Sequence, residues 1–258
     1  MDLKISIISV CYNCSKTILD TIRSVNRQSY PNIEHVFVDG LSSDNTLEII
    51  RSNSKKKNVI ISEKDSGLYD AINKGILNAT GDVIGLLHSD DILSSPEIIS
   101  DLIAKINDEN LDGVYGDLQY VDKENTKKII RFWKTCEFKP NLLRKGWMPP
   151  HPTLILKKEV YQKHGVFNKS FKIAADYDFM LRILKDSNLK FGYLPKVVTK
   201  MRVGGASNRS IKNIIKKSKE DYRAIRSNNI GGIITLLLKN TSKIKQFLNK
   251  KKNDLQRN

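Results

Sequence analysis

Two adjacent carboxylates, Asp90 and Asp91, stand just beyond an apolar run that ends at Leu87, after His88 and Ser89. Neighbouring negative charges each disfavour ionisation of the other unless a cation or hydrogen bonds compensate. Mg²⁺ and Mn²⁺ can supply that compensation, because both bind through one or two carboxylates together with the phosphates of a substrate. The simpler alternative is a polar strand end followed by a helix that Ser94, Ser95 and Pro96 cap.

Polar residues also follow two earlier apolar runs of the chain. Tyr12 and Asn13 come after the first run, and Asp39 comes after the second. If the runs are parallel strands of one sheet, their carboxyl ends meet at the edge where open α/β sheets bind ligands. This convergence predicts a ligand site at that edge.

The elements that must position these residues alternate between strand and helix. In the first third we expect strands at 4–10, 33–38, 59–62 and 82–87, and helices after Ser15 or Thr17, from Ser43 through Arg51, and at 68–78. Further strands are expected at 113–120, 128–133 and 153–156, with helices at 158–163 and from about 174 to 184. The order predicts an α/β fold with a doubly wound, mostly parallel sheet and right-handed crossovers.

Known phosphate-binding loops are missing from the sequence. It has no GxGxxG after the first strand and no GxxxxGK[ST] segment, so neither a dinucleotide nor a P-loop site is supported. A metal ion held by carboxylates is the remaining way to hold a nucleotide diphosphate at the strand ends.

Three further candidate binding residues lie in the less regular segment 117–203. Trp147 could stack on an acceptor sugar or anchor its loop in the core. His151, in a proline-rich loop, could bind a ligand or pack within the loop. Arg202 could contact a diphosphate or belong to the charged surface.

The composition indicates a globular protein that acts in a reduced, cytoplasmic compartment. The 258 residues include only three cysteines, so a disulfide framework is not expected, and Cys11 and Cys14 form an isolated CxxC without a second pair for zinc. No segment resembles a signal peptide, and no run approaches the roughly 18 to 20 apolar residues of a membrane-spanning helix.

The C-terminal segment carries most of the net charge. From residue 211 onward there are thirteen basic and three acidic residues, a net +10 out of +16 for the chain. The apolar run 230–238, followed by Lys239, Lys243, Lys245 and the lysines at 250–252, predicts an amphipathic anchor on an anionic membrane surface. The alternative is a helix docked on the domain and followed by a basic end.

Five motifs together resemble one known family. They are VCYN (10–13), VDGLSSDNT (38–46), EKDSGLYDAINKGI (63–76), GDVIGLLHSDD (81–91) and AADYDFMLR (174–182). In order and spacing the series is similar to the inverting GT-A glycosyltransferases of family 2, especially the bacterial enzymes that build O-antigen, capsule or exopolysaccharide. The resemblance covers about residues 4–207.

The resemblance implies a role for each matching residue. Tyr12 and Asn13 would lie on the nucleotide, Asp39 would accept a hydrogen bond from a uracil-like base, and Asp65, Asn73 and Lys74 would line the donor pocket. Asp90 and Asp91 would contact the ribose and a divalent cation, Mn²⁺ or Mg²⁺, and Asp176 would be the catalytic base. The sequence departs from the family pattern at His88, where a further carboxylate is common, and at Ala175, where a glutamate usually precedes the aspartate.

The expected organisation is a Rossmann-like GT-A domain with a basic helical tail. Residues 1–115 would bind the donor, 116–208 would form a smaller acceptor-side half that carries the catalytic base, and 209–258 would be the tail. The implied activity is transfer of a sugar from a nucleotide donor, UDP-linked by expectation, to a lipid-linked saccharide in surface polysaccharide synthesis. The enzyme would be peripheral on the inner face of the bacterial cytoplasmic membrane.

Two other classes of protein stay open. A sugar-1-phosphate nucleotidyltransferase should carry a glycine-rich basic loop after the first strand, and the segment at 11–15, CYNCS, is not one. A non-enzymatic module that binds nucleic acid or carbohydrate is suggested by charge alone. Nucleic acid is not expected as a partner, because the positive charge gathers in the tail rather than on a recognition fold.

Overall fold

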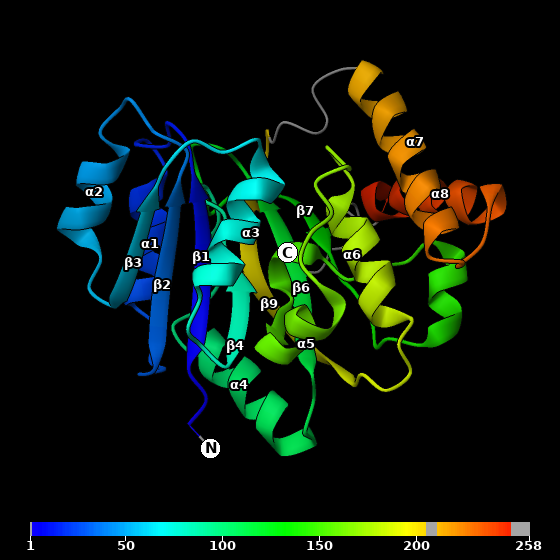
Figure 1. Cartoon of the computed structure of the whole chain (residues 1–258), viewed down its shortest axis with the longest axis horizontal. Coiled ribbons are helices and arrows are strands. Elements are labelled where there is room, and N and C mark those ends of the chain that lie inside the picture. The colour runs from blue at the N-terminus through cyan, green and yellow to red at the C-terminus, as the bar shows by residue number, and fades with distance from the viewer. Residues whose placement is uncertain (1, 205–210, 249–258) are drawn as a thin grey trace, which may run out of the picture.

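The computed structural model describes residues 2–204 and 211–248, and one mixed sheet runs through the described part (Figure 1). The strands are β1 (Ile5–Cys11), β2 (Ile33–Asp39), β3 (Lys57–Ser62), β4 (Val83–Leu86), β5 (Ile92–Leu93), β6 (Gly113–Val121), β7 (Ile129–Trp133), β8 (Ile155–Lys157) and β9 (Phe191–Arg202). The helices are α1 (Ile18–Asn26), α2 (Thr46–Asn53), α3 (Leu68–Asn78), α4 (Ile98–Glu109), α5 (Lys158–His164), α6 (Ala175–Leu184), α7 (Ile211–Ser227), α8 (Ile233–Leu248) and the 3₁₀ turns η1 (Pro140–Lys145) and η2 (His151–Thr153). The strand order is β3-β2-β1-β4-β8-β6-β9-β5, and β7 pairs with β6.

Helices cover both faces of the sheet, as the alternation of strands and helices predicts. Apolar side chains of α3, α5 and α6 share one buried cluster with Ile8 and Val36, whereas those of α1 and α2 pack with Phe37 on the other face. The second face continues under α4, where Ile5 and Ile7 are buried. Strands of this kind are apolar toward both layers, so the fold class expected from the sequence is confirmed.

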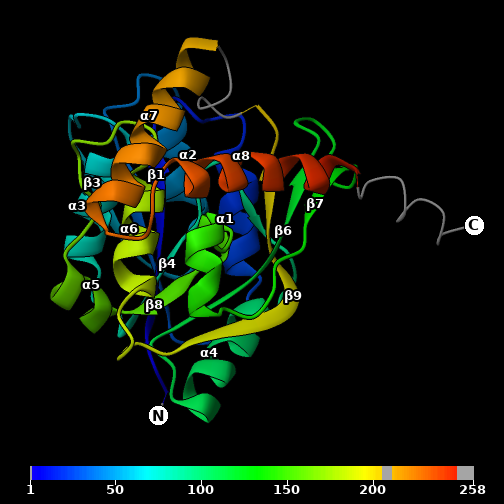
Figure 2. The ribbon, with the colours of Figure 1, turned by 90° about the vertical axis from the view of Figure 1, so that its right-hand side faces the viewer.

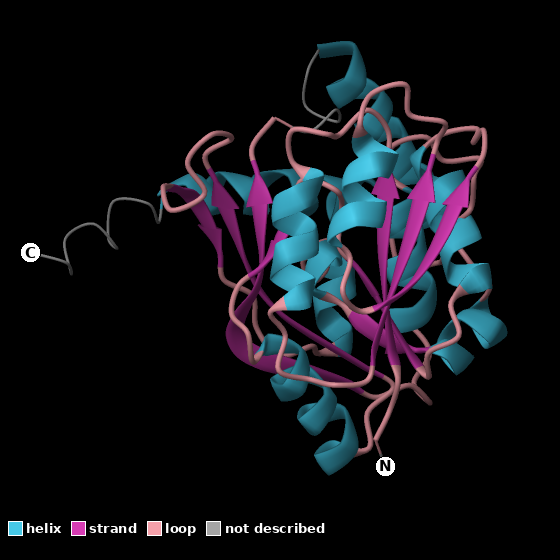
Figure 3. Cartoon of the chain, turned by 90° about the vertical axis from the view of Figure 1, so that its left-hand side faces the viewer, coloured by secondary structure: helices cyan, strands magenta, loops and turns pink. Residues whose placement is uncertain are grey.

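The polar residues at the carboxyl ends of the first four strands lie at one edge of the sheet. β2, β1 and β4 are parallel neighbours, and β3 extends the parallel set beyond β2. Figure 3 shows their arrowheads at the same edge of the sheet. The loops that follow β1, β2 and β4 therefore lie close together, as a ligand site at the carboxyl ends requires.

The strand β9 was not expected from the sequence. It runs parallel to β6 over twelve residues, but its pairing shifts register beside Gly116 and Asp117. Pro195 and Lys196 fall at this irregularity, and a proline is tolerated in a strand at such a bulge. The interruption hides the strand from a search for alternating apolar residues.

The C-terminal helices α7 and α8 pack on the domain. Ala224, Ile225, Ile230 and Leu236 belong to the same buried cluster as α6, and α8 crosses beside α7 and α6 in both views (Figures 1 and 2). A side chain at Gly146, which has φ +71°, would come within 2.4 Å of the Lys239 Cβ, so α8 packs directly on this turn. The structure therefore shows a docked helix up to Thr241, and the lysines at 250–252 lie outside the described residues.

Candidate active site

The loops after β1, β2 and β3 meet at Gly40. A Cβ built on this glycine would lie 2.5 Å from Oδ2 of Asp65 and 3.5 Å from the ring of Tyr12, so only a glycine fits here without displacing Asp65. The Tyr12 side chain is 68% exposed, which leaves its ring open to stack on a planar group. The structure thus brings together Tyr12 and Asp65, two of the residues predicted to bind the donor.

Asp39 and Asn13 support the place where these three loops meet, hereafter the Gly40 corner. The carboxylate of Asp39 is buried and accepts hydrogen bonds from the Ser42 backbone (3.1 Å), the Ser42 hydroxyl (2.5 Å) and the Ser62 hydroxyl (2.8 Å). Asn13, at φ +48°, accepts a hydrogen bond from the Ser43 backbone (2.9 Å) and donates its own N–H to Ser42 (2.8 Å). Asp39 therefore holds the loop that shapes the corner, and its contact with a base stays a prediction.

Asn73 and Lys74 hold α3 to its neighbours. The side-chain amide of Asn73 donates to the Phe167 carbonyl (2.8 Å) and accepts from the Phe167 N–H (2.9 Å). The Lys74 ammonium donates to the Lys64 carbonyl (2.7 Å) and pairs with Glu63 (2.7 Å), which raises the pKa of Lys74. In the structure both side chains are engaged by the protein, so their part in the donor pocket also stays a prediction.

Cys14 joins the β1 loop to the loop that carries Asp90. Its N–H donates to Thr46 (2.9 Å), and its thiol interacts with Cys11 and Ser89. The hydrogen bond with Cys11 is the main reason why the pKa of Cys14 falls to about 7, and burial opposes it. The two loops that would flank a donor are thereby in contact.

Asp91 carries a buried carboxylate that no described group satisfies. The residue is fully buried, and neither of its carboxylate oxygens has a hydrogen-bond partner among the described residues. Burial and the neighbouring Asp90 raise the pKa of Asp91 well above its usual value, although Arg202 opposes this. Unpaired buried carboxylate oxygens are the donor set that a divalent cation takes, so the residues fit the metal that the resemblance implies.

The pair would have to share the metal with a ligand. Among the described residues no group of three or more histidine, cysteine, aspartate or glutamate side chains is placed to hold an ion. Two carboxylates leave most positions of an octahedral ion open for phosphate oxygens or water. This matches a site that is completed by a substrate diphosphate.

The guanidinium of Arg202 holds the loop that carries Asp90. Its guanidinium donates to the Asp90 carbonyl (2.8 Å), to the Lys123 carbonyl (3.1 Å) and to the Asp20 carboxylate (2.6 Å). The residue is buried. The structure therefore gives Arg202 a positioning contact with the aspartate loop, and a direct contact with a diphosphate stays a prediction.

Asp176 lies in the first turn of α6 and faces the aspartate loop. It is partly exposed and accepts a hydrogen bond from the Tyr69 hydroxyl (3.3 Å). Both Asp90 and Asp176 act electrostatically on His88, where they oppose the burial that lowers the pKa of His88. Asp91 and Asp176 both add to the raised pKa of Tyr120. Asp176 thus acts on two side chains, of which His88 is also affected by Asp90 and Tyr120 by Asp91.

The neighbouring Asp178 is engaged elsewhere. Its carboxylate accepts a hydrogen bond from Asn228 (3.0 Å) and pairs with Arg182 (3.4 Å), and the residue is buried. Asp178 therefore belongs to the packing of α6 on α7, whereas Asp176 is left on the open side of the helix.

His151 lies beside His88, whereas Trp147 packs against the core. The His151 ring is 6.0 Å from that of His88, its Nε2 is buried without a partner among the described residues, and burial lowers the pKa of His151 to about 4. Trp147 packs on Phe138 (5.8 Å) and Tyr115 (5.9 Å). The structure favours the core-anchoring interpretation of Trp147 and brings His151 to Asp176.

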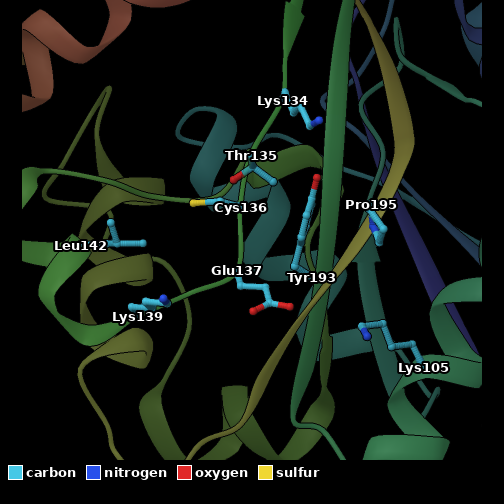
Figure 4. A pocket seen from close by; sticks show the side chains of 9 residues that line it. All are labelled: Lys105, Lys134, Thr135, Cys136, Glu137, Lys139, Leu142, Tyr193 and Pro195. Atoms are coloured by element: carbon cyan, nitrogen blue, oxygen red, sulfur yellow. The ribbon is translucent and has the colours of Figure 1, made fainter.

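A separate open cavity of about 720 Å³ contains none of the predicted site residues. It is lined by Lys105, Lys134, Lys139, Tyr193 and neighbours, and it lies at the start of β9 (Figure 4). Because β9 is parallel to β6, and β6 is parallel to β4 through β8, this is the opposite edge of the sheet from Asp90. The cavity is therefore not the donor site.

Sequence reasoning missed two tyrosines near Asp176. Tyr69 lies inside the motif at 63–76, but no spacing rule connects it to a residue more than a hundred positions later. Tyr120 reaches the site only because β6 pairs with β9 and β7, and the guanidinium of Arg131 covers its ring at 4.5 Å. Both contacts depend on tertiary structure that cannot be predicted from the sequence pattern.

Known proteins match both the sequence and the fold. The model of Glycosyl transferase family 2 matches residues 6–148, more than half of the chain. An uncharacterized glycosyltransferase of Mycobacterium tuberculosis is 28% identical over 180 residues, which are 69% of this chain and 68% of that protein. A PGL/p-HBAD biosynthesis glycosyltransferase of Mycobacterium bovis is 29% identical over 208 residues, 79% of this chain and 78% of that protein.

The solved structures that resemble this chain share its fold. S. aureus TarS 1–349 in complex with UDP-GlcNAc superposes with a TM-score of 0.67 at 19% identity, over 88% of this chain and 65% of that one. A mannosyltransferase of Pyrobaculum calidifontis in complex with GDP-Man and Mn²⁺ gives 0.63 at 17% identity, over 87% of this chain and 64% of that one. This chain spans slightly less than two thirds of each of these structures, and the likeness at this identity concerns the fold.

Proposed function

The chain belongs to glycosyl transferase family 2 and is a glycosyltransferase with the GT-A fold, and we propose that it transfers a sugar, with inversion, from a UDP-linked donor to a lipid-linked saccharide. The family assignment favours glycosyl transfer over nucleotidyl transfer and over a non-enzymatic binding module. The donor, the acceptor, the metal and the residue roles below are parts of the proposal.

The observation that carries this proposal is the convergence of three carboxylates. Asp90 and Asp91 follow β4, and Asp176 begins α6, yet Asp90 and Asp176 both act on His88 while Asp91 and Asp176 both act on Tyr120. A transfer site needs one place for the leaving diphosphate and another for a base that faces the attacking hydroxyl. Asp90 and Asp91 would serve the leaving diphosphate, and Asp176 would be the base.

The donor nucleotide would lie in the corner at Gly40. The exposed Tyr12 ring offers a stacking surface, and Asp39 and Asp65 supply acceptors for N–H and hydroxyl groups. A carboxylate at Asp39 suits the N–H of uracil, and the TarS structure of the same fold contains UDP-GlcNAc. These observations support a UDP-sugar as the donor.

Asp176 would accept the proton of the attacking hydroxyl. The Tyr69 hydroxyl donates chiefly to the Ile173 carbonyl (2.8 Å) and also reaches Asp176 Oδ1 (3.3 Å), so it positions this oxygen while the other remains for the acceptor. His151 is neutral at pH 7 and can orient a sugar hydroxyl next to this base. Attack from the side of Asp176, with the diphosphate leaving toward Asp90, is a single displacement and inverts the anomeric carbon.

Asp90 and Asp91 would hold a divalent cation. When bound, Mn²⁺ or Mg²⁺ would neutralise the charge that develops on the leaving diphosphate. Arg202 fixes the backbone that presents both aspartates, through its bond to the Asp90 carbonyl. Asp91 is the stronger candidate for the metal, because both its buried oxygens are without partners among the described residues.

The acceptor would be presented at a membrane surface. No described helix combines the length and the apolar character that crossing a bilayer requires. The α8 face turned away from the domain exposes Ile233, Ile234, Leu237 and Leu238, each between 43% and 70% accessible. Exposed apolar residues next to a lysine-rich end are the features of a helix that lies in an anionic interface, and they support a peripheral location on the cytoplasmic membrane in surface polysaccharide synthesis.

The proposal is tested by a hydrolysis and thermal-shift panel with Mn²⁺. The panel contains UDP-glucose, UDP-galactose, UDP-N-acetylglucosamine and GDP-mannose, the last because a structure of the same fold binds GDP-Man. We expect stabilisation and slow hydrolysis with a UDP-sugar that disappear when EDTA replaces Mn²⁺. A protein that responds only to GDP-mannose would contradict the UDP assignment, and one that responds to no sugar nucleotide would contradict the proposed activity.

A further inference from the structure

The backbone just before α6 is held by a carboxylate from another helix. Glu220 of α7 accepts three backbone hydrogen bonds: from Lys172 to Oε1 (3.1 Å), and from Ile173 (2.8 Å) and Ala174 (3.0 Å) to Oε2. The residue is 8% exposed. Three successive N–H groups that converge on one carboxylate form an anion-binding turn of the kind found before helices.

This carboxylate replaces the missing cap of α6. The residue at the N-cap position is Ala174, which has no side chain that could accept a hydrogen bond from the first turn. A negative charge beside the N-terminus of a helix is favourable, because the helix dipole is positive there. Glu220 therefore fixes the start of α6 from outside the helix.

The same turn is coupled to the proposed catalytic base. The Ile173 N–H is bound by Glu220, and the Ile173 carbonyl accepts a hydrogen bond from the Tyr69 hydroxyl (2.8 Å). Tyr69 shares this hydroxyl with Asp176 (3.3 Å). Hydrogen bonds thus hold Ile173 through both its N–H and its carbonyl group. Because α6 begins two residues later and carries Asp176 in its first turn, the position of Asp176 depends on this backbone.

We propose that Glu220 is a positioning residue for Asp176, so that the C-terminal helix α7 is a working part of the catalytic site. The inference rests on the proposed role of Asp176 in glycosyl transfer. Glu220 lies outside residues 6–148, which match the family model. It acts on the reaction through backbone geometry and touches no substrate.

The neighbouring residue Asp221 offers a matched control. It is also buried on α7, but its carboxylate pairs with the Lys239 ammonium of α8 (2.6 Å) and has no contact with residues 172–174 among the hydrogen bonds described. That ammonium also lies 3.0 Å from the centre of the Tyr177 ring. Loss of this pair should loosen α8 and leave the turn before α6 in place.

The experiment compares Glu220→Gln with Asp221→Asn in the full chain. For Glu220→Gln we expect kcat for hydrolysis of the active UDP-sugar to fall roughly 10- to 100-fold, because small misplacements of a catalytic group have effects of this size. KM and the affinity for UDP with Mn²⁺ should stay within about twofold, since the donor corner is built by other elements. For Asp221→Asn we expect a lower melting temperature, by several degrees or more, with kcat close to that of the wild type.

Hydrogen exchange gives a readout that does not depend on turnover. Glu220→Gln should speed the exchange of the amides at 172–174, and Asp221→Asn should not. Unchanged exchange of these amides, unchanged kcat, or an equal loss of kcat in both variants would overturn the positioning role. A wild type without turnover would instead contradict the proposed function, and the exchange measurement would still decide whether Glu220 holds the turn.

Discussion

At the scale of single residues, the types and spacing of side chains predict the chemistry of the site but not the surroundings of each group. Asp90, Asp91 and Asp176 are predicted as site residues because strand ends and family motifs mark them. Asp178 ranks below Asp176 on the sequence alone, because it falls inside the expected helix, and in the structure Asn228 and Arg182 engage its carboxylate. Glu220 carried no sequence signal, because its three partners are backbone N–H groups some 46 to 48 residues away.

The metal assignment makes a prediction for Asp91. Replacing Asp91 with alanine should remove the tightening of UDP binding by Mn²⁺, a loss of roughly tenfold or more in affinity, or about 1.4 kcal/mol per tenfold. The reason is that Asp91 supplies the buried oxygens without partners. Titration calorimetry of UDP with Mn²⁺ and with EDTA measures the effect. A variant whose UDP affinity still rises with Mn²⁺ would show that the metal is held elsewhere.

At the scale of elements, most regular segments were predicted, whereas the interrupted strand β9 was not. The expected helix at 68–78 is α3 with the same bounds, β1 is shifted by one residue at each end, and β2 extends one residue beyond the expected end. By contrast, β9 contains a proline at a register shift and charged residues along its length, so its pattern does not alternate. β9 forms because its neighbour β6 supplies the pairing, which is long-range information.

The buried Glu34, which links β2 to neighbouring segments, should make the stability of the protein depend on pH. Glu34 of β2 is buried, and burial alone would raise its pKa, but hydrogen bonds from Lys4 (2.8 Å), Thr80 (2.6 Å) and Ser6 (2.7 Å) lower it to about 2. The ordinary value is 4.5. Because the folded-state pKa is depressed, this stabilisation is complete above pH 4.5 and is lost as the pH falls toward 2.

The corresponding variant is Glu34→Gln. It should lower the free energy of unfolding at pH 7 by roughly 3 kcal/mol, on the order of the shift multiplied by 1.36 kcal/mol per unit. It should also weaken the acid dependence between about pH 4.5 and 2. Urea unfolding at several pH values measures both effects, with the exposed Glu48→Gln as the control. An acid dependence equal to that of the wild type would contradict the assignment to Glu34.

At the scale of the whole molecule, we propose two tasks for the C-terminal segment, packing on the domain and binding a membrane surface. Its first part is bound into the domain through Glu220, Asp221 and Lys239. Its exposed apolar face and basic end are the features that support membrane binding. The sequence alone left docking and anchoring as alternatives, because one amphipathic helix can serve either purpose until its partners are known.

Two deletions separate these tasks. Removing residues 242–258, which include six basic residues and one acidic residue, should keep the melting temperature and donor hydrolysis. It should weaken binding to phosphatidylglycerol vesicles by roughly tenfold or more, since each basic residue near such a surface contributes about 1 kcal/mol.

Removing residues 209–258 should lower both the melting temperature and hydrolysis. Flotation with phosphatidylglycerol and with pure phosphatidylcholine vesicles, together with thermal unfolding, measures the two effects. Full activity after the longer deletion would show that α7 and α8 are appendages, and unchanged vesicle binding after the shorter one would remove the basic end as an anchor.

If Asp176 removes the proton from the attacking hydroxyl, its amide variant must lose turnover without losing the donor or the metal. Turnover of the active UDP-sugar should be compared between the wild type, Asp176→Asn and the control Asp178→Asn, with UDP and Mn²⁺ affinity measured on the same samples. Asp176→Asn should lower kcat by about 10²- to 10⁴-fold while UDP and Mn²⁺ bind as before, and Asp178→Asn should keep its turnover. Turnover by Asp176→Asn that equals the wild type, at unchanged donor affinity, would contradict the role of Asp176 as the base.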